Sequence, residues 1–439
     1  MKVCAVELYN YRNYAAQSVT VSPAINIFLG RNAQGKTNIL EGIWYAAIGR
    51  SHRAKNDGEL IRWAEKKGRL FLRLDRKSAV NTLEFRFFKG QRRQIFHNGQ
   101  EIARRELIGV FNAVLFSPED LLLIKGAPEG RRRFLNMELS QADPAYFYDL
   151  AVYTRLLNQR NALLKKLRDH GGNPAQLLPW DEQLAAAAAR VVKRRQKAVA
   201  DLSRLAGAIH QRLTAGEENL TVAYQLHSAV NDVADPSASW YNEMLKKAES
   251  GDIRRGSTSV GPHLDDLSLT VNGVDLRVYG SQGQQRTGVL SLKLAELEFL
   301  RAAAGEYPVL LLDDVMSELD RGRRDELLAF LTREKIQTFI TATDAAYFAV
   351  WAESILAGLG LKETVVSRQL FVGFLSLLFR VAGDHWLLTI DLLTGTLALI
   401  PALLFLLGAQ LHSEGAGAIA AGIAILRELN TLYMAPYFG

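Results

Sequence analysis

Cysteine is almost absent from the chain, because Cys4 is the only one among 439 residues. A single thiol cannot form an intramolecular disulfide, so we expect a protein of the reducing cytoplasm that is held together by packing. The first residues mix apolar side chains with Glu7 and Arg12, and no signal peptide is therefore expected. Repeats of fixed period are missing as well, which argues against a solenoid or a propeller.

Acidic residues are slightly outnumbered: the chain has 53 Lys and Arg against 46 Asp and Glu, a formal net charge of +7. A modest basic excess permits a polyanionic partner but does not establish one. The hydrophobic share of 48% is that of an ordinary globular protein, with apolar material for one large or two medium cores.

Charge is lacking altogether in residues 392–411, a run of twenty residues with Pro401 near its middle. Such a run has the length of a membrane span. Residues 358–439 therefore allow three interpretations: a membrane anchor or hairpin, a helical pair buried on the rest of the protein, or an aberrant end such as a shifted reading frame. The motifs described next all lie upstream and do not depend on the choice.

The most specific motif is a glycine-rich loop that matches the phosphate-binding P-loop pattern. It consists of Gly30, Arg31, Asn32, Ala33, Gln34, Gly35, Lys36 and Thr37. An apolar run at 25–29 precedes it and apolar residues at helical spacing follow it, so the loop connects a strand to a helix as the motif requires. Backbone N–H groups and the helix N-terminus favour phosphate there. We expect Lys36 to reach the β- and γ-phosphates of ATP, and the Thr37 hydroxyl to ligate Mg²⁺.

A second anion site is predicted at Ser281, Gly283 and Gln284, a Ser-x-Gly-Gln turn that opens a predicted helix over 287–304. Helix-start N–H groups and a serine hydroxyl suit a phosphate oxygen. The next strand, 309–312, ends in Asp313 and Asp314. We expect Asp313 to hold Mg²⁺ together with Thr37, and Asp314 to orient or deprotonate the attacking water.

Strands are predicted at 70–74, 83–88 and 95–102, with a type I′ hairpin at Asn98-Gly99. This small antiparallel sheet carries a basic strip with few nearby acids, formed by Arg73, Arg86, Lys89, Arg92, Arg93, Arg104 and Arg105. Arg53, beyond the P-loop helix, faces either the nucleotide or solvent.

Helical patterning dominates residues 128–250, and the basic residues of these helices are either solvated or DNA-facing. Among them are Arg190, Lys193, Arg194, Arg195 and Lys197. Residues 256–280 return to strand pattern, with a second hairpin signal at Asn272-Gly273.

Taken together, these elements resemble the ATP-binding cassette ATPases of the SMC type, and among them the RecF family, over about residues 1–357. Segments 116–121, 131–135, 159–161, 261–266 and 312–320 contribute to the resemblance. It implies an α/β fold: a P-loop ABC-type ATPase head, SMC-like, with an antiparallel β subdomain and an inserted α-helical domain. The expected domains are two ATPase lobes at 1–127 and 254–357, the helical domain at 128–253, and an atypical extension at 358–439.

The resemblance also implies a mechanism. Two subunits would close on two ATP molecules, each held between one P-loop and the partner's Ser281, with Asp320 in the D-loop and Thr343 at the switch position. The dimer would embrace DNA, single-stranded, duplex or at junctions, and slow hydrolysis would release it. RecO and RecR would be partners in RecA loading, fork recovery and the SOS response. The chain departs from related ATPases at Asp314, where transporters have Glu, at Thr343, where many have His, and in lacking a clear Q-loop glutamine.

Other functions fit the residues less well. The Ser-x-Gly-Gln turn at Ser281 corresponds to the signature motif of the related ATPases. In a transporter ATPase this motif lies much closer to the P-loop than Ser281 lies to Gly30. A P-loop GTPase would show an Asn-Lys-x-Asp motif for guanine, which the sequence lacks. A purely structural binding module would not need Lys36, Asp313 and Asp314 together.

Overall fold

The computed structural model describes residues 1–30, 33–76, 79–227, 236–317, 319 and 321–342. The uncharged run 392–411 lies outside these ranges, as do Arg31, Asn32, Asp320 and Thr343. Among the helices within the ranges, none has both the length and the apolar character needed to cross a membrane.

A four-stranded parallel sheet forms the centre of the molecule. Its order is β3 (Ile25–Leu29), β13 (Thr338–Ala342), β12 (Val309–Asp313) and β8 (Ala113–Phe116). Alternate residues of these strands enter two different hydrophobic cores, so the sheet is buried on both faces. Continuous apolar strands are typical of parallel sheets covered on both sides, and this is why the sequence shows short apolar runs at each of them.

One face is covered by α1 (Lys36–Ile48) and a six-stranded antiparallel sheet. The order of that sheet is β2 (Tyr14–Thr20), β1 (Lys2–Tyr11), β4 (Lys67–Arg76), β5 (Ala79–Phe88), β6 (Gln94–His97) and β7 (Gln100–Glu101). The predicted hairpin is confirmed, because Asn98 and Gly99 have φ of 51° and 79°, as a type I′ turn requires. Strand β2 was not predicted.

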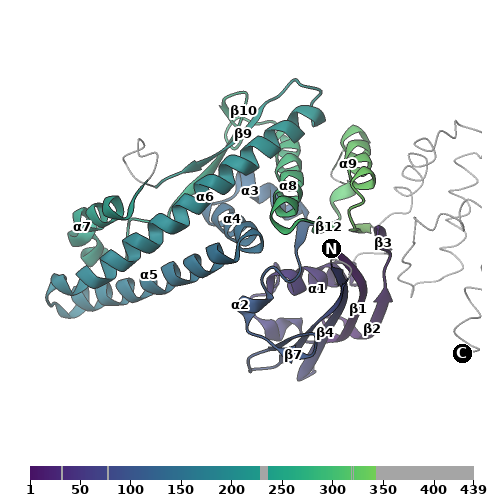
Figure 1. Ribbon diagram of the computed structural model, residues 1–439, viewed down its shortest axis with the longest axis horizontal. Coiled ribbons are helices and arrows are strands. Elements are labelled where there is room, and N and C mark those ends of the chain that lie inside the picture. Colours follow the sequence, from purple (N-terminus) through teal and green to yellow (C-terminus); the bar gives the residue numbers. More distant parts are fainter. Residues whose placement is uncertain (31–32, 77–78, 228–235, 318, 320, 343–439) are drawn as a thin grey trace, which may run out of the picture.

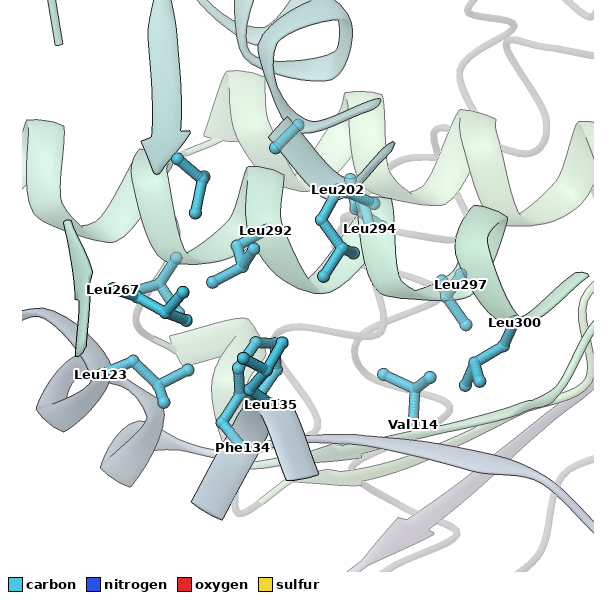
Figure 2. Close-up of a cluster of buried hydrophobic side chains, with 14 of the residues drawn as sticks. Val114, Leu123, Phe134, Leu135, Leu202, Leu267, Leu292, Leu294, Leu297 and Leu300 are labelled. Carbon is cyan, nitrogen blue, oxygen red and sulfur yellow. The ribbon is translucent and has the colours of Figure 1, made fainter. Parts of the chain in front are cut away.

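The other face is covered by α8 (Gln282–Ala304) and α4 (Pro128–Ala142). Figure 2 shows Leu297 and Leu300 of α8 beside Val114 of β8, and Leu292 and Leu294 of the same helix above the α4 side chains. Leucines of one helix thus fill the space between the sheet and the inserted helices.

The inserted region is built on two long helices, α5 (Pro144–His170) and α6 (Leu178–Leu213), that lie side by side (Figure 1). The 36 residues of α6 make it about 54 Å long. A strand within the insertion, β9 (Leu220–Gln225), pairs with β10 (Asp266–Val271) of the C-terminal lobe, so the two regions share a sheet. Helix α7 (Ala238–Arg255) continues past residue 253, where the sequence placed the end of the helical domain.

The remaining elements are short except for α9. They are η1 (Asp57–Leu60), α2 (Arg104–Leu107), η2 (Pro118–Leu121), α3 (Leu122–Lys125), η3 (Pro174–Leu177), β11 (Val274–Asp275), η4 (Val315–Ser317) and α9 (Arg321–Arg333). Strand β11 follows Asn272 and Gly273, whose φ of 51° and 80° confirm the second predicted hairpin.

The prediction that the early basic strip has few nearby acids is wrong. Arg86 Nε lies 2.8 Å from Glu84 Oε1, and Arg93 pairs with Asp57. Glu84 lies two residues before Arg86 in β5, and Asp57 belongs to η1, which packs beside the loop that carries Arg93. The first carboxylate was visible in the sequence, whereas the second is brought near only by the fold.

The basic residues of the inserted helices were expected to be either solvated or DNA-facing, and this pair of alternatives also needs correction. Arg195 is 2% exposed and donates to Tyr146 Oη at 3.0 Å and to the carbonyl of Pro262 at 2.6 Å. It is therefore neither solvated nor available to DNA. Arg190 and Arg194 are partly exposed but share Asp149 as their ion-pair partner, at 2.9 and 3.1 Å.

Arg160 holds the inserted helices together. Its guanidinium donates to Asp181 of α6 at 2.6 Å and to Asp252 of α7 at 2.8 Å, and the side chains of Arg160 and Asp252 are fully buried. Replacing Arg160 by leucine is expected to lower the free energy of unfolding by about 3–5 kcal/mol, because the carboxylate of Asp181 would lose its cation and the buried Asp252 would keep, of its described ion-pair partners, only Arg255, at 2.8 Å. Urea denaturation followed by the helical signal measures it. Arg155→Leu, at an exposed position of the same helix, is the control and should have little effect.

Candidate nucleotide-binding site

A polar cavity of about 330 Å³ lies at the carboxyl ends of the parallel strands. Its lining comes from the P-loop, the start of α1, the loop after α1, and the ends of β12 and β13. The lining residues are Ala33, Gly35, Lys36, Thr37, Asn38, Arg53, Asp313, Asp314 and Thr341. In open parallel sheets, ligands bind at this end of the strands.

The P-loop backbone adopts conformations that exclude most side chains. Gly35, the N-cap of α1, has φ of 102°, and a Cβ there would lie 2.6 Å from the side-chain amide of Asn13. Ala33 also has a positive φ, 66°. Such turns direct successive N–H groups into a concave anion site at the helix N-terminus.

Lys36 supplies the cation of this cavity. Its side-chain Nζ donates to the carbonyl of Gly30, at the start of the same loop. Burial lowers the pKa of Lys36, and the carboxylates of Asp314 and Asp313 oppose that shift. A cation held in this way between backbone and acids is placed to exchange its partners for phosphate oxygens.

Asp313 joins the P-loop helix to the neighbouring strand. Its Oδ1 accepts from the Thr37 hydroxyl at 2.9 Å and from the Thr341 hydroxyl at 2.7 Å. One carboxylate and one hydroxyl fit Mg²⁺, which usually binds through one or two carboxylates, waters and substrate phosphates. No cluster of three or more His, Cys, Asp or Glu that could hold a metal occurs in the part of the chain that the structure describes.

Asp314 has φ of 56°, an uncommon conformation for a residue with a side chain. Its backbone N–H donates to the Thr341 hydroxyl at 2.9 Å, which fixes the strained turn directly after β12. Strained residues often mark functional sites, and the cavity lining includes this side chain.

The predicted Ser-x-Gly-Gln turn opens a helix, α8, which begins at Gln282 and not at the predicted residue 287, and the turn lies away from the cavity. Ser281 is the N-cap of α8, with its Oγ accepting from Gln284 N at 3.2 Å and Gln284 Oε1 accepting from Ser281 N at 2.9 Å. Neither residue lines the cavity, and Ser281 is exposed. Val278 and Tyr279 beside it are 65% and 74% exposed. The structure therefore brings Lys36, Thr37, Asp313 and Asp314 together and leaves Ser281 apart from them.

Known proteins resemble this chain in sequence and in fold. A sequence profile described as "RecF/RecN/SMC N terminal domain" matches residues 2–359. The "DNA replication and repair protein RecF" of Bacillus cereus (strain G9842) is 41% identical over 346 residues, 78% of this chain and 92% of that protein. The protein of the same name from Heliobacterium modesticaldum (strain ATCC 51547 / Ice1) is 42% identical over 351 residues, 80% of this chain and 94% of that protein.

This chain belongs to the RecF family. The solved "Structure of the recombination mediator protein RecF-ATP in RecFOR pathway" is 36% identical and has a TM-score of 0.74. The matched region covers 78% of this chain and 92% of the solved chain. The resemblance predicted from the motifs and the predicted fold class are thereby confirmed.

Sequence reasoning missed a buried charge pair behind the P-loop of this RecF-family chain. Glu41 of α1 is fully buried and accepts from Arg12 at 2.6 and 2.8 Å and from the Ser51 hydroxyl at 2.5 Å. Burial alone would raise the pKa of Glu41, but the hydrogen bonds from Arg12 and Ser51 outweigh it and hold the pKa below its ordinary value. No sequence signal pairs Arg12 with Glu41, because the two are brought together only by the sheet packing on α1.

The position of Arg53 bears on the two alternatives left open by the sequence, because the residue is exposed and also lines the cavity. Its side-chain Nη1 donates to Asn38 Oδ1 at 3.3 Å. Asn38 in turn donates to Asn13 Oδ1 at 2.9 Å, and Asn13 donates to the carbonyl of Gln34 at 3.0 Å. The phosphate-facing alternative is favoured, and Asn38 and Asn13 join the site as positioning residues.

The turn at Ser281–Gln284 is also held by Glu218, which in turn contacts a buried histidine. Gln284 donates to Glu218 Oε1 at 2.8 Å, while Glu218 Oε2 lies 3.1 Å from His210 Nε2. His210 is fully buried, and its Nδ1 lies 2.9 Å from the Ser291 hydroxyl. Burial lowers the pKa of His210, although Glu218 opposes the shift. The turn is thus held from the inserted helices as well as from α8.

Proposed function

We propose that this chain is an ATP-dependent DNA-binding protein of recombinational repair and replication-fork recovery. ATP drives two copies of the chain to close around DNA at gaps or at single-/double-strand junctions. With RecO and RecR, the closed dimer assists RecA loading and SOS induction. Hydrolysis is slow and stimulated by DNA, and it acts as a switch that reopens the dimer.

The observation that carries the proposal is the bond from Thr37 to Asp313, two residues 276 positions apart in sequence that meet at the P-loop cavity. Lys36 binds the β- and γ-phosphates there, Thr37 and Asp313 hold Mg²⁺, and Asp314 orients or deprotonates water. Mg²⁺ held by Thr37 and Asp313 would supply positive charge against the phosphates. Family membership supports the proposed role in DNA repair, since the relatives are named for DNA replication and repair.

The signature acts on the partner's nucleotide in this proposal. Ser281, Gly283 and Gln284 meet the γ-phosphate bound by the other subunit, with Asp320 in the D-loop and Thr343 at the switch. Residues 1–127 and 254–357 form the ATPase lobes, 128–253 the inserted helical domain, and 358–439 the extension. The sheet shared by β9 and β10 implies that the helical domain moves with the C-terminal lobe.

DNA binding measured with and without ATP, with the particle mass measured in parallel, tests the proposal. The expected result is tighter binding to gapped DNA with ATP, accompanied by a doubling of the mass. Equal binding in both conditions by a particle of one chain would contradict it. A nucleotide that binds but is not hydrolysed should preserve the effect, because closure needs binding and not turnover.

DNA is expected to be held mainly through its phosphates. The logarithm of the affinity should then fall linearly with the logarithm of salt, by about 0.9 for each phosphate neutralised. Affinity should differ little between sequences, because phosphate contacts carry no sequence information. Titrations at several salt concentrations with two unrelated sequences measure both. A shallow slope or a preference for one sequence would be contrary to this prediction.

A further inference from the structure

Trp63 is 95% exposed, more than any other large hydrophobic side chain that the structure describes. It lies in the loop between η1 and β4, at one end of the six-stranded sheet. Single exposed apolar residues are common on protein surfaces, so exposure alone defines no site. The backbone, the neighbouring charges and the position of the loop supply the further argument.

The backbone around Trp63 is pinned on both sides. Glu65 N donates to Arg62 O at 3.0 Å and closes a turn whose central residues are Trp63 and Ala64. Ala64 has φ of 70°, a conformation that residues with a side chain rarely adopt. Arg62 N donates to Asn10 O at 2.9 Å and fastens the turn to the end of β1. The indole is therefore presented on a fixed backbone, which reduces the entropy lost when a ligand binds.

Exposed cations flank Trp63 in and directly after its own loop and in the loop after β5. They are Arg62, Lys66, Lys67 and Lys89. Lys89 N donates to Lys66 O at 3.0 Å, which brings the loop after β5 beside the Trp63 turn. None of the four forms an ion pair with a described residue, whereas Arg69 and Arg86 on the outer face of the sheet both pair with Glu84. The turn therefore has four exposed cations without a described ion-pair partner near it, three in or directly after its own loop and one joined to it by the Lys89–Lys66 bond. Glu65, the nearest acid in sequence, is half-buried.

The turn also lies at the sheet end that carries the nucleotide cavity. Arg12 N donates to Leu60 O at 2.7 Å, next to the Arg62–Asn10 bond. Asn13, the following residue, donates to the carbonyl of Gln34 in the P-loop at 3.0 Å. The hairpin between β1 and β2 thus contacts the Trp63 loop on one side and the P-loop on the other.

We propose that Trp63 stacks on an unpaired base of single-stranded DNA while the surrounding cations bind the flanking phosphates. Stacking on an aromatic face accepts any base, and cations bind the backbone, so the pair recognises single strands without reading their sequence. In a duplex the base faces are covered by their neighbours and only the edges are open in the grooves. Trp63 would therefore distinguish a gap or a tail from continuous duplex. The inference rests on the proposed DNA binding and names the DNA feature that this surface recognises.

The test compares Trp63→Ala and Trp63→Phe in the full chain, with ATP and Mg²⁺ at fixed salt. The probes are a blunt duplex and the same duplex with a single-stranded tail. Trp63→Ala should weaken binding to the tailed probe by roughly 5- to 100-fold, with the blunt duplex nearly unchanged. Trp63→Phe should retain most of the affinity, because a benzyl ring still stacks. Tyr148→Ala, at a 69% exposed position of α5, is the matched control and should change neither affinity.

The possible results are separable. Equal losses on both probes would overturn the inference, since the residue would then contact duplex DNA. Unchanged binding of both probes by Trp63→Ala would also overturn it and would leave the surface to a protein partner. If the unmodified chain binds neither probe with ATP, the proposed function itself fails and this inference falls with it. Melting temperatures of the variants should match that of the unmodified chain, because the side chain is exposed.

Discussion

Replacing Lys36 by alanine is expected to lower the affinity for ATP by roughly 30-fold or more. Removing one partner of a buried charge pair costs about 2–5 kcal/mol, and each 1.4 kcal/mol is about a factor of ten in affinity. Lys36 is only 7% exposed, and the carboxylates of Asp313 and Asp314 influence its pKa. Without this cation the two acids would face the phosphates unopposed. The affinity would therefore fall because the Lys36–phosphate attraction is lost and because the carboxylates then repel the phosphates.

Titration of labelled ATP in the presence of Mg²⁺ measures the loss. Lys55→Ala is the matched control, because Lys55 is exposed, lies in the loop after α1, and does not line the cavity. The affinity of the Lys55→Ala chain for ATP should equal that of the unmodified chain. If Lys36→Ala also binds ATP normally, the nucleotide does not bind at this loop, and the roles proposed for Thr37 and Asp313 fall as well.

The elements that carry the phosphate chemistry were predictable because each is a short pattern with a local cause. The P-loop needs glycine where the backbone turns to positive φ, and Gly35 at 102° is such a position. The run that ends in Asp313 is apolar because β12 is buried on both faces. Such patterns are visible in the sequence alone, and the structure places these residues around one cavity.

The charged residues of the inserted helices were not predictable in the same way. Arg160 and Arg195 occur in helical sequence that resembles a solvated surface, yet both are buried. The two acids that pair with Arg160 lie 21 and 92 residues away in sequence. A charge run indicates a surface only when no distant carboxylate or hydroxyl reaches it, and the sequence alone does not contain that information.

Strand β9 was missed for a related reason. Its partner β10 is more than forty residues further along the chain, and the segment lies inside a region dominated by helical periodicity. Long-range pairing overrode the local pattern. The same limit applies to Arg12 and Glu41, whose bidentate contact depends on how the antiparallel sheet packs on α1.

Replacing Ser281 by arginine is expected to abolish ATP-dependent dimerisation while leaving ATP binding by the single chain nearly unchanged. The cavity residues Lys36 and Thr37 are untouched, and Ser281 does not line that cavity. A Cβ at Gly283 would meet only Ser281 Oγ, at 3.8 Å, so the described part of the chain gives no steric reason for glycine there. Space and N–H donors that the chain itself leaves unused are what a partner's γ-phosphate would occupy.

Loss of the N-cap has to be separated from loss of the phosphate contact, since removing a serine cap costs about 1 kcal/mol. Ser237→Arg removes a comparable cap at α7, where Ser237 Oγ accepts from Trp240 N at 3.2 Å, and should still dimerise. Ser281→Asp keeps a capping side chain but places negative charge beside the phosphate. It should fold normally and fail to dimerise, which the arginine variant alone would not establish.

A mixing experiment decides whether Ser281 acts on its own chain's nucleotide or on the partner's. A Ser281→Arg chain mixed with a Lys36→Ala chain retains one composite site in which both the P-loop and the signature are intact. Light scattering with ATP should then detect mixed dimers, although neither variant dimerises alone. If Ser281 served the nucleotide of its own chain, every site in the mixture would carry a defect and no dimer would form. Normal dimerisation by Ser281→Arg alone would likewise rule out a shared site.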